Sequence, residues 1–206
     1  MSRVLAAGPS MPERPPTDHA WVEVGLAMEP GVAVAFCAED AERLFRINPF
    51  YQIVRWRRTA PGAADIVLRN LGNDRIIETR LSIEPLRDGL RVAYAQGLKA
   101  STTFRVATSA AGAVLTVTDE YRALPESERL QRLAEVDRSL TQWGRELQRY
   151  LMRWGRWNWC APWRCYMARV WLPMKPPARR IAFMLTIFTA AEFAAFLAVL
   201  AIFLLA

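Results

Sequence analysis

The sequence predicts an α+β protein in which a curved antiparallel sheet wraps around one long C-terminal helix, followed by one transmembrane helix. Three observations support this prediction. Several short stretches between residues 51 and 124 alternate apolar and polar side chains, as half-buried strands do. A helical repeat of apolar residues then runs through residues 125–154. The last stretch, residues 181–206, holds a single ionisable side chain, Glu192.

One strand and two short helices are expected before the main run of strands. Residues 21–29 alternate apolar and polar side chains, and Pro30 ends this strand. Residues 32–48 have helical spacing and stop before Pro49, because the residue that precedes a proline disfavours helix. We expect two short helices here, with Cys37 as a small core residue.

Six further strands are expected, joined by turn dipeptides such as Pro61-Gly62 and Asn73-Asp74. Short links between alternating stretches are typical of an antiparallel meander. One face of this sheet is apolar, and the other carries Arg, Glu, Thr and Ser. The expected strands are residues 51–58, 64–72, 74–86, 89–97, 101–109 and 113–124.

The long helix is expected to cover the apolar face of the sheet. Apolar residues recur at mostly three or four positions from Leu130 to Trp154, with Glu and Arg between them. About 28 residues make a helix about 42 Å long. A curved sheet with one long helix across it leaves a space that side chains or a ligand can fill.

This order of elements resembles the START-like or SRPBCC superfamily, the helix-grip proteins that include polyketide cyclases and lipid-transfer domains. The stretch AEDAERLFRINPF, residues 38–50, is similar to the helix-turn segment before the second strand of many bacterial members. The resemblance covers about residues 20–152. It implies a hydrophobic cavity, and binding or carriage of a lipid, quinone or polyketide-like molecule. It does not imply an enzyme, because members of one fold differ in chemistry.

Candidate ligand-binding residues come from the inward phase of the strands and from the long helix. Polar groups among them can meet oxygens of a ligand, since buried tyrosine hydroxyls need partners. The alternative is an ordinary core in which the carboxylate is satisfied within the protein. The candidates are Thr79, Val92, Tyr94, Thr102, Phe104, Leu115, Val117, Asp119, Tyr121 and Trp143.

Catalysis has weaker support in the sequence than binding. An aspartate near a tyrosine can do acid-base work, so a cyclase-like enzyme stays open as an alternative. The sequence shows no nucleophile motif and no phosphate-cradling glycine loop. Cys160 and Cys165 lack a second pair and a nearby histidine, since His19 lies in the N-terminal arm. We therefore expect no metal and no cofactor.

The net charge of +7 belongs to one segment. Eight basic residues and no acidic one lie between Arg149 and Arg180, and Glu192 follows them, so the charges of residues 1–148 cancel. Such a distribution argues against a nucleic-acid-binding domain. It indicates a membrane surface as the partner, because basic residues beside a span attract anionic lipid.

A Trp- and Arg-rich segment, residues 153–180, is expected to lie at the membrane interface. Residues 153–171 contain five of the eight tryptophans, a residue that favours the headgroup level. Prolines in this segment predict a short interfacial helix followed by a stiff, extended connector. The expected interface residues are Arg153, Trp154, Arg156, Trp157, Trp159, Trp163, Arg164, Trp171, Arg179 and Arg180.

Residues 181–206 are expected to form a single-pass tail anchor. Twenty-six residues reach about 39 Å as a helix, enough for a hydrocarbon core of about 30 Å. The flexible N-terminal arm, residues 1–19, has no apolar signal stretch. Because basic residues precede the span, residues 1–180 are expected on the cytoplasmic side of the inner membrane.

Glu192 lies near the middle of the expected span, where an unpaired charge costs at least about 2.5 kcal/mol. Thr189 and Ala195 share its helix face, and Ala191 with Ala195 gives a small-residue spacing that permits close packing. These four residues are expected to contact an integral membrane protein subunit. The alternative is an uncharged glutamic acid that faces lipid.

Two classes of function remain, and they are not exclusive. The first is a membrane-anchored domain that binds or carries a hydrophobic ligand. The second is an accessory or assembly subunit of a larger membrane complex. Arginines on the outward face of the sheet slightly favour docking of a partner, although a solvated charged face is the simpler interpretation; they are Arg55, Arg57, Arg69 and Arg80.

Overall fold

The computed structural model describes residues 19–122 and 126–205, apart from the side chains of residues 126–138 and Leu205. The expected N-terminal arm therefore lies outside the described residues, except for His19, which begins the first strand. The strands are β1 (His19–Leu26), β2 (Tyr51–Ala60), β3 (Ala63–Asn70), β4 (Arg75–Leu86), β5 (Gly89–Tyr94), β6 (Lys99–Ser109) and β7 (Gly112–Tyr121). The helices are α1 (Pro30–Glu39), α2 (Ala41–Ile47), α3 (Glu126–Trp157), α4 (Ala161–Tyr166), the π-helical turn η1 (Met167–Trp171) and α5 (Pro176–Leu205).

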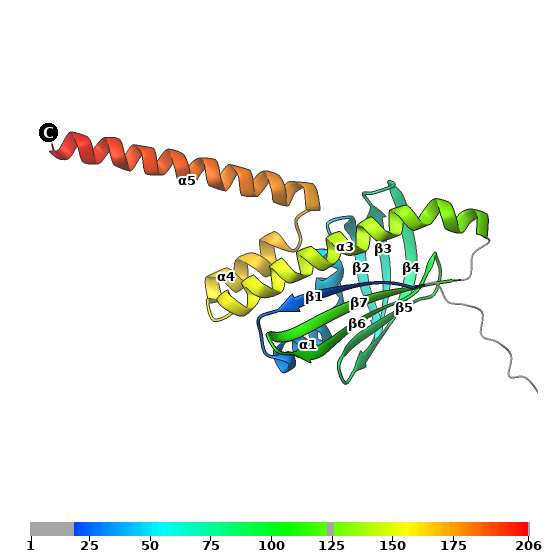
Figure 1. The fold of residues 1–206 in the computed structure, drawn as a ribbon. Helices are drawn as coiled ribbons and strands as arrows, with labels where there is room; N and C mark the ends of the chain where they lie inside the picture. Colours follow the sequence, from blue (N-terminus) through cyan, green and yellow to red (C-terminus); the bar gives the residue numbers. More distant parts are fainter. Residues whose placement is uncertain (1–18, 123–125, 206) are drawn as a thin grey trace, which may run out of the picture.

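Seven strands form one antiparallel sheet in the order β1-β7-β6-β5-β4-β3-β2 (Figure 1). Strands β2 to β7 are a meander, and β1 returns to pair with β7, placing Val24 opposite Leu115. Burial along β7 alternates at every residue, as expected for a strand with one face against a core. The predicted strand order and the apolar phase of the sheet are therefore confirmed.

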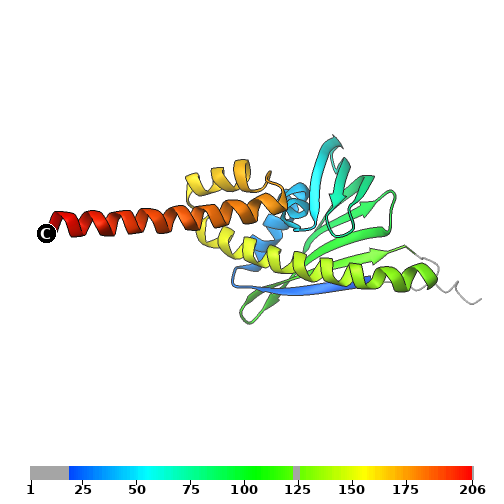
Figure 2. The ribbon, with the colours of Figure 1, turned by 90° about the horizontal axis from the view of Figure 1, so that it is seen from above.

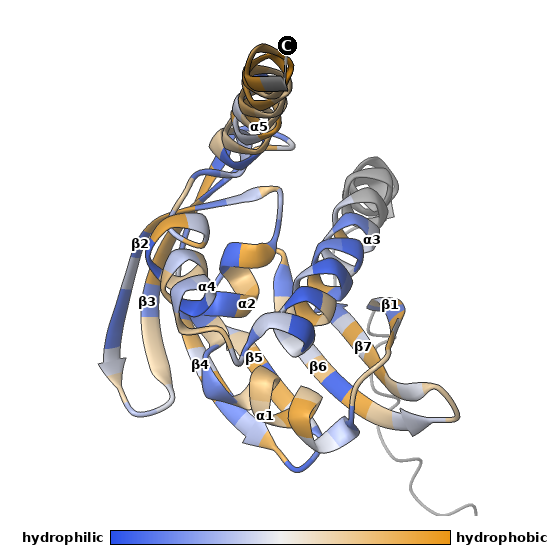
Figure 3. Ribbon diagram, turned by 90° about the vertical axis from the view of Figure 1, so that its left-hand side faces the viewer, coloured by the Kyte–Doolittle hydropathy of each residue, from blue (hydrophilic) through white to orange (hydrophobic). Residues whose placement is uncertain are grey.

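Helices α1, α2 and α3 all lie on the inner side of the curved sheet (Figure 3). Trp143 of α3 is buried at the centre of this layer, with ring centroids 5.7 Å from Phe45 and 5.4 Å from Phe104. Its indole N–H donates to the carbonyl oxygen of Leu44 at 3.0 Å, which ties α3 to α2. One long helix held across the sheet is the helix-grip arrangement that the sequence predicts.

The arginines on the outer face of the sheet are paired with carboxylates of the same sheet or its turns. Asp65 accepts hydrogen bonds from both Arg57 and Arg80, at 3.0 and 2.9 Å. Arg55 pairs with Glu78 at 3.0 Å. Arg69 likewise pairs with Asp74 at 2.7 Å. These four arginines thus form exposed ion pairs, and docking of a partner on this face stays a prediction.

The segment after α3 folds back against the domain. Met167 and Leu172 are buried in the main hydrophobic core, and the ring of Trp171 lies 5.5 Å from that of Tyr150. The expected extended connector is wrong. Only residues 172–175 link η1 to α5, because α5 already begins at Pro176 and Pro177. Prolines are tolerated there because the backbone N–H groups of the first helical turn have no partner within the helix.

Helix α5 has 30 residues and leaves the domain (Figure 2). Residues Pro176–Leu204 are long and apolar enough to cross a membrane, and none of their most apolar stretch is buried within the chain. The turn between α3 and α4 extends in the same direction as α5 in both Figure 1 and Figure 2. The sheet lies on the opposite side, away from the free end of α5 (Figure 1).

Candidate functional site

A cavity of about 270 Å³ lies between the sheet and α3. Its walls are mostly apolar, and its polar groups come from the β3–β4 and β5–β6 connections. Of the predicted ligand-binding residues, only Tyr94 and Tyr121 line it. The lining residues are Tyr51, Leu68, Asn70, Asn73, Arg75, Ile77, Tyr94, Gln96, Gly97, Leu98, Lys99, Tyr121 and Ser139.

A buried polar network closes the inner end of this cavity. Asp119 is fully buried and accepts hydrogen bonds from the ammonium group of Lys99 and, at 2.5 Å, from the hydroxyl of Thr102. The hydroxyl of Tyr121 donates to the same carboxylate at 3.4 Å. The hydroxyls of Tyr94 and Thr102 share a further hydrogen bond of 2.9 Å. The Lys99 side chain is only 16% exposed, so the ion pair is largely removed from water.

The network fixes the protonation of its members near neutral pH. Burial alone lowers the pKa of Lys99, but the charge of Asp119 and the nearby phenols outweigh it and hold that pKa well above its ordinary value. Burial raises the pKa of both Tyr94 and Tyr121. Besides Arg75 and Tyr51, which also line it, the cavity therefore presents the ammonium group of Lys99 and the neutral phenols of Tyr94 and Tyr121.

Lys99 can also serve a ligand. An ammonium group has three donors, and Asp119 is its one hydrogen-bond partner among the described residues. The nitrogen also lies 5.7 Å from the ring centroids of Tyr51 and Trp143, so aromatic faces surround the charge. An apolar molecule with a carbonyl or carboxylate oxygen matches this combination of walls and donor.

The other predicted ligand-binding residues lie in the packed layer behind the cavity. Trp143, with the aromatic rings around it, fills the centre of the space between helix and sheet. Thr79 is satisfied by the backbone, since its hydroxyl donates to the carbonyl oxygen of Gln96 at 3.1 Å. The predicted ligand-binding residues that are buried but do not line the cavity are Thr79, Val92, Thr102, Phe104, Leu115, Val117, Asp119 and Trp143.

Lys99 is the residue that sequence reasoning missed. Strict alternation along β6 puts Lys99 in phase with Ser101 and Arg105, on the face away from Phe104. The pairing shows why this count fails: Lys99 lies opposite Tyr121, whereas Ser101 lies opposite Glu120, so the ladder shifts by one residue between them. Such a bulge re-aims a side chain and leaves no clear mark in one sequence.

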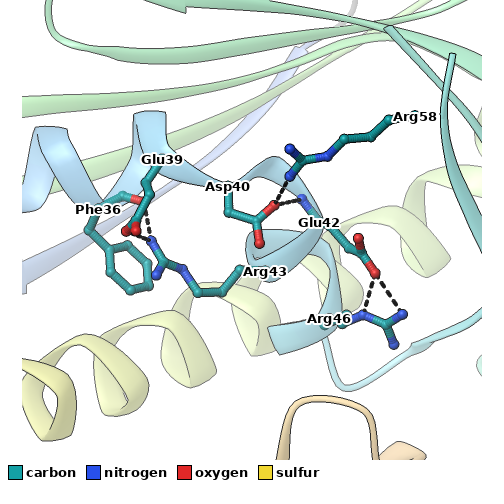
Figure 4. A network of polar contacts seen from close by, with 7 residues as sticks. All are labelled: Phe36, Glu39, Asp40, Glu42, Arg43, Arg46 and Arg58. Atoms are coloured by element: carbon teal, nitrogen blue, oxygen red, sulfur yellow. Dashed lines mark hydrogen bonds and ion pairs between the residues drawn. The ribbon is translucent and has the colours of Figure 1, made fainter. Parts of the chain in front are cut away.

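A second and larger hollow, of about 560 Å³, lies where α1 and α2 face the end of α3 and the α4–η1 segment. Four of its charged groups pair with one another (Figure 4): Arg43 donates to Glu39 at 3.0 Å, and Arg46 to Glu42 at 2.7 Å. The guanidinium of Arg43 also stacks over the ring of Phe36 at 3.8 Å. This hollow is less suited to an apolar ligand than the cavity at Lys99.

The expected interface tryptophans divide into two groups. Trp154, Trp163 and Trp171 are half-buried against the domain. Trp157 and Trp159 lie exposed at the turn between α3 and α4, with Trp159 exposed at 77% and the two rings stacked at 6.4 Å. Among the expected interface tryptophans, the exposed pair is the one that is free to meet a membrane surface.

The cavity opens at the end of the domain away from that turn. Ser139 lies at the cavity, whereas Tyr150 packs against Trp171, eleven residues further along α3 or about 17 Å. The α3–α4 turn therefore lies away from this cavity, and α5 extends in the same direction as that turn (Figure 1).

Metal chemistry has no visible support in the part of the chain that the structure describes. Residues 19–122 and the described side chains after them contain no group of three or more His, Cys, Asp or Glu side chains able to hold a metal ion. Cys160 and Cys165 are free thiols.

Comparison with known proteins identifies the fold. No protein-family model matches the sequence, and no curated protein matches it by sequence. The di-domain ARO/CYC StfQ from the steffimycin biosynthetic pathway is similar in structure, with a TM-score of 0.51 and 12% identity over 68% of this chain and 52% of that one. KanY gives a TM-score of 0.49 and 13% identity over 66% of this chain and 98% of that one.

A third similar structure, Ara h 8.0201, gives a TM-score of 0.44 and 12% identity over 67% of this chain and 99% of that one. The chain spans about half the length of the di-domain protein. The likeness to the ARO/CYC protein StfQ supports the helix-grip fold that the strands and α3 of this chain display. At such low identity the likeness concerns the fold alone.

Proposed function

We propose that the protein is a membrane-anchored helix-grip domain that binds or carries a hydrophobic molecule bearing a carbonyl or carboxylate oxygen. The observation that carries this proposal is the Lys99 ammonium group at the end of an apolar cavity of about 270 Å³. A cation in such a place is costly unless partners compensate it, and Asp119 uses only part of its donor capacity. A fatty-acid, quinone or polyketide-like oxygen is a suitable further acceptor.

The proposed anchor is α5, as a single pass through the inner membrane with the domain on the cytoplasmic side. Its length and apolar composition support a span. The basic residues before the span support this orientation. Trp157 and Trp159 at the α3–α4 turn supply a second contact at the headgroup level. In this arrangement the ligand enters from the aqueous side of the domain.

Photocrosslinking of the full chain in vesicles tests the ligand-binding proposal. The probe is a fatty acid with a photoreactive group in its chain, which combines an apolar body with a carboxylate. We expect crosslinks at β3, β4 and the β5–β6 connection, which excess fatty acid competes away. The double variant Lys99→Met with Asp119→Asn removes both charges together, so it should keep the fold and lose about tenfold in crosslinking. Crosslinks confined to α5 and the α3–α4 turn contradict the proposal.

A second candidate function is that of an accessory subunit of a membrane complex. The observation behind it is Glu192, which lies in a helix whose apolar stretch has no burial within the chain. A membrane partner that packs against Thr189, Ala191, Glu192 and Ala195 compensates this group. Glu192→Leu should release a co-purifying membrane subunit, whereas Phe193→Leu should not. Unchanged co-purification in Glu192→Leu removes this candidate.

A further inference from the structure

A small hollow of about 110 Å³ lies between α2, β2 and the start of α5. Its charged lining consists of three cations from three different elements: Arg46 of α2, Lys175 of the connector and Arg179 of α5. The amide of Gln52 adds a neutral polar group, and no carboxylate lines the hollow among the described residues. The volume equals about four water molecules in the liquid, which suits a small anion and excludes an acyl chain.

The two arginines are held in place and still have donors to spare. Arg46 uses Nε and Nη2 on the carboxylate of Glu42, at 2.7 and 2.6 Å (Figure 4). Arg179 uses Nε and Nη2 on the carbonyl oxygens of Trp171 and Leu172, at 3.0 and 2.8 Å. The Nη1 group of each arginine has no partner in the described part of the chain. A guanidinium fixed on one side loses little further entropy when its other side binds.

The charge balance of the hollow favours an anion. Glu42 offsets one of the three cations, and the carbonyl oxygens that hold Arg179 carry no net charge. The carboxylate of Glu146 also acts on Arg179, but it lies outside the lining and is paired with Arg149. The ring of Trp171, 4.2 Å from the Arg179 guanidinium, fixes this cation without neutralising it. An oxyanion that accepts hydrogen bonds from all three groups relieves their mutual repulsion.

The position of the hollow indicates which oxyanion it meets. Pro176 lines it and lies five residues, about 7.5 Å along the helix, before Ile181. Lipid headgroups occupy a layer of roughly 5–8 Å on each side of the hydrocarbon core. A span that begins near Ile181 therefore sets this hollow at the depth of the lipid phosphates.

We infer that Arg46, Lys175 and Arg179 form a binding site for a phosphate group, presented by the headgroup of an anionic phospholipid or as free phosphate. For the lipid source, the inference rests on the proposed membrane span. Because the three cations come from the domain, the connector and α5, one bound phosphate fixes the angle at which the domain stands on its anchor.

Native mass spectrometry of the full chain in mild detergent tests this site with phosphatidylglycerol as the probe. Lys175→Gln is the first variant, because its ammonium group has no partner among the described residues whose loss could disturb the fold. Arg46→Gln is the second. Each should reduce the retained lipid about tenfold. Arg169→Gln is the matched control, since it removes one charge from the same segment without lining the hollow; it should leave retention unchanged.

Inorganic phosphate distinguishes the two sources. If phosphate displaces the lipid, or raises the melting temperature of the wild type and not of Lys175→Gln, the site recognises the phosphate group itself. Retention of lipid that phosphate does not displace assigns the site to the headgroup in its membrane setting. An equal loss of lipid in Arg169→Gln shows a diffuse charge effect and overturns the inference. If neither phosphatidylglycerol nor inorganic phosphate binds the wild type, the inference is overturned too.

Failure of this inference is distinguishable from failure of the proposed function. The retained phosphatidylglycerol is counted in detergent, so the count does not depend on α5 spanning a bilayer. The double variant Lys99→Met with Asp119→Asn alters two residues that do not line the small hollow, so it should retain the lipid fully. Extraction of the chain from membranes by alkaline carbonate tests the span by itself.

Discussion

The ion pair of Lys99 and Asp119 is the most consequential contact at the scale of single residues. Both groups are largely buried, so the removal of one partner leaves a charge without compensation. We expect Lys99→Met to lower the free energy of unfolding by about 3–5 kcal/mol. The double variant with Asp119→Asn should recover most of this loss, because it removes the orphaned charge. Thermal unfolding in mild detergent measures the stability of both variants. Equal destabilisation of the single and the double variant contradicts the ion pair of Lys99 and Asp119.

Cys37 makes stability depend on pH. Burial raises the pKa of this thiol from 9.0 to about 12, against a smaller opposing effect of Arg43. Above pH 9.0 the unfolded chain therefore loses a proton that the folded chain keeps, and stability falls as pH rises. The free energy of unfolding should drop by about 1.4 kcal/mol between about pH 8 and 10 from this group.

The matched variant for this prediction is Cys37→Ala, which has no thiol to titrate. Its decline in stability over the same interval should be smaller than that of the wild type by that amount. The tyrosines add their own decline only above about pH 10. Parallel pH profiles of wild type and variant refute the assignment to Cys37.

At the scale of elements, Gly144 sets the distance between α3 and β1. A glycine inside a helix costs about 1 kcal/mol relative to alanine, so its presence needs a reason. A Cβ atom at this position meets the two methyl carbons of Val22 at 2.9 and 3.0 Å. The helix thus lies too close to β1 for any side chain.

This close approach predicts that the effect of Gly144→Ala on stability changes sign with the size of residue 22. Gly144→Ala in the wild type should destabilise the fold by about 1–3 kcal/mol through overpacking. In a Val22→Ala background, where only the looser contact with Val24 at 3.3 Å remains, the same substitution should instead stabilise by up to about 1 kcal/mol through the helix preference. The test compares the melting temperatures of the wild type, the two single variants and the double variant. If Gly144→Ala changes stability in the same direction in both backgrounds, the contact with Val22 is not the cause.

The α3–α4 turn gives a second prediction at this scale. A fluorescent label on Cys160, in a chain whose other cysteines are replaced, should be quenched by brominated lipid chains in vesicles. The control label at Ile76→Cys sits on the exposed face of β4, where Ile76 is 70% exposed. It should show no quenching. Equal accessibility of the two labels to an aqueous quencher contradicts membrane contact by the turn.

At the scale of the whole molecule, the fold was predictable because it depends on periodicity. Burial along β7 and the buried face of α3 follow the alternation and the helical repeat that the sequence displays. The space between sheet and helix was also foreseen. The groups that fill this space were not predictable. Its centre is occupied by Trp143 and aromatic rings from three other elements. Such packing depends on distances between elements, which the spacing of residues in the sequence does not give.

The site itself was predictable only in part. The inward phase of their strands predicts Tyr94 and Tyr121 as site residues. It does not predict Lys99, because the register of β6 shifts by one residue between Lys99 and Ser101. Pairing of outer-face arginines such as Arg57 with Asp65 depends on the register of neighbouring strands. The extended connector was predicted from prolines, but at the start of a helix the same residues are compatible with α5.

Native mass spectrometry of the chain extracted from its own membrane tests the central claim most directly. We predict a bound apolar small molecule that is lost in Ile77→Trp, which fills the cavity, and retained in Ile76→Trp, which places the same bulk on the opposite face of β4. A wild-type chain that carries no small molecule, or equal retention in the two variants, contradicts ligand binding in this cavity.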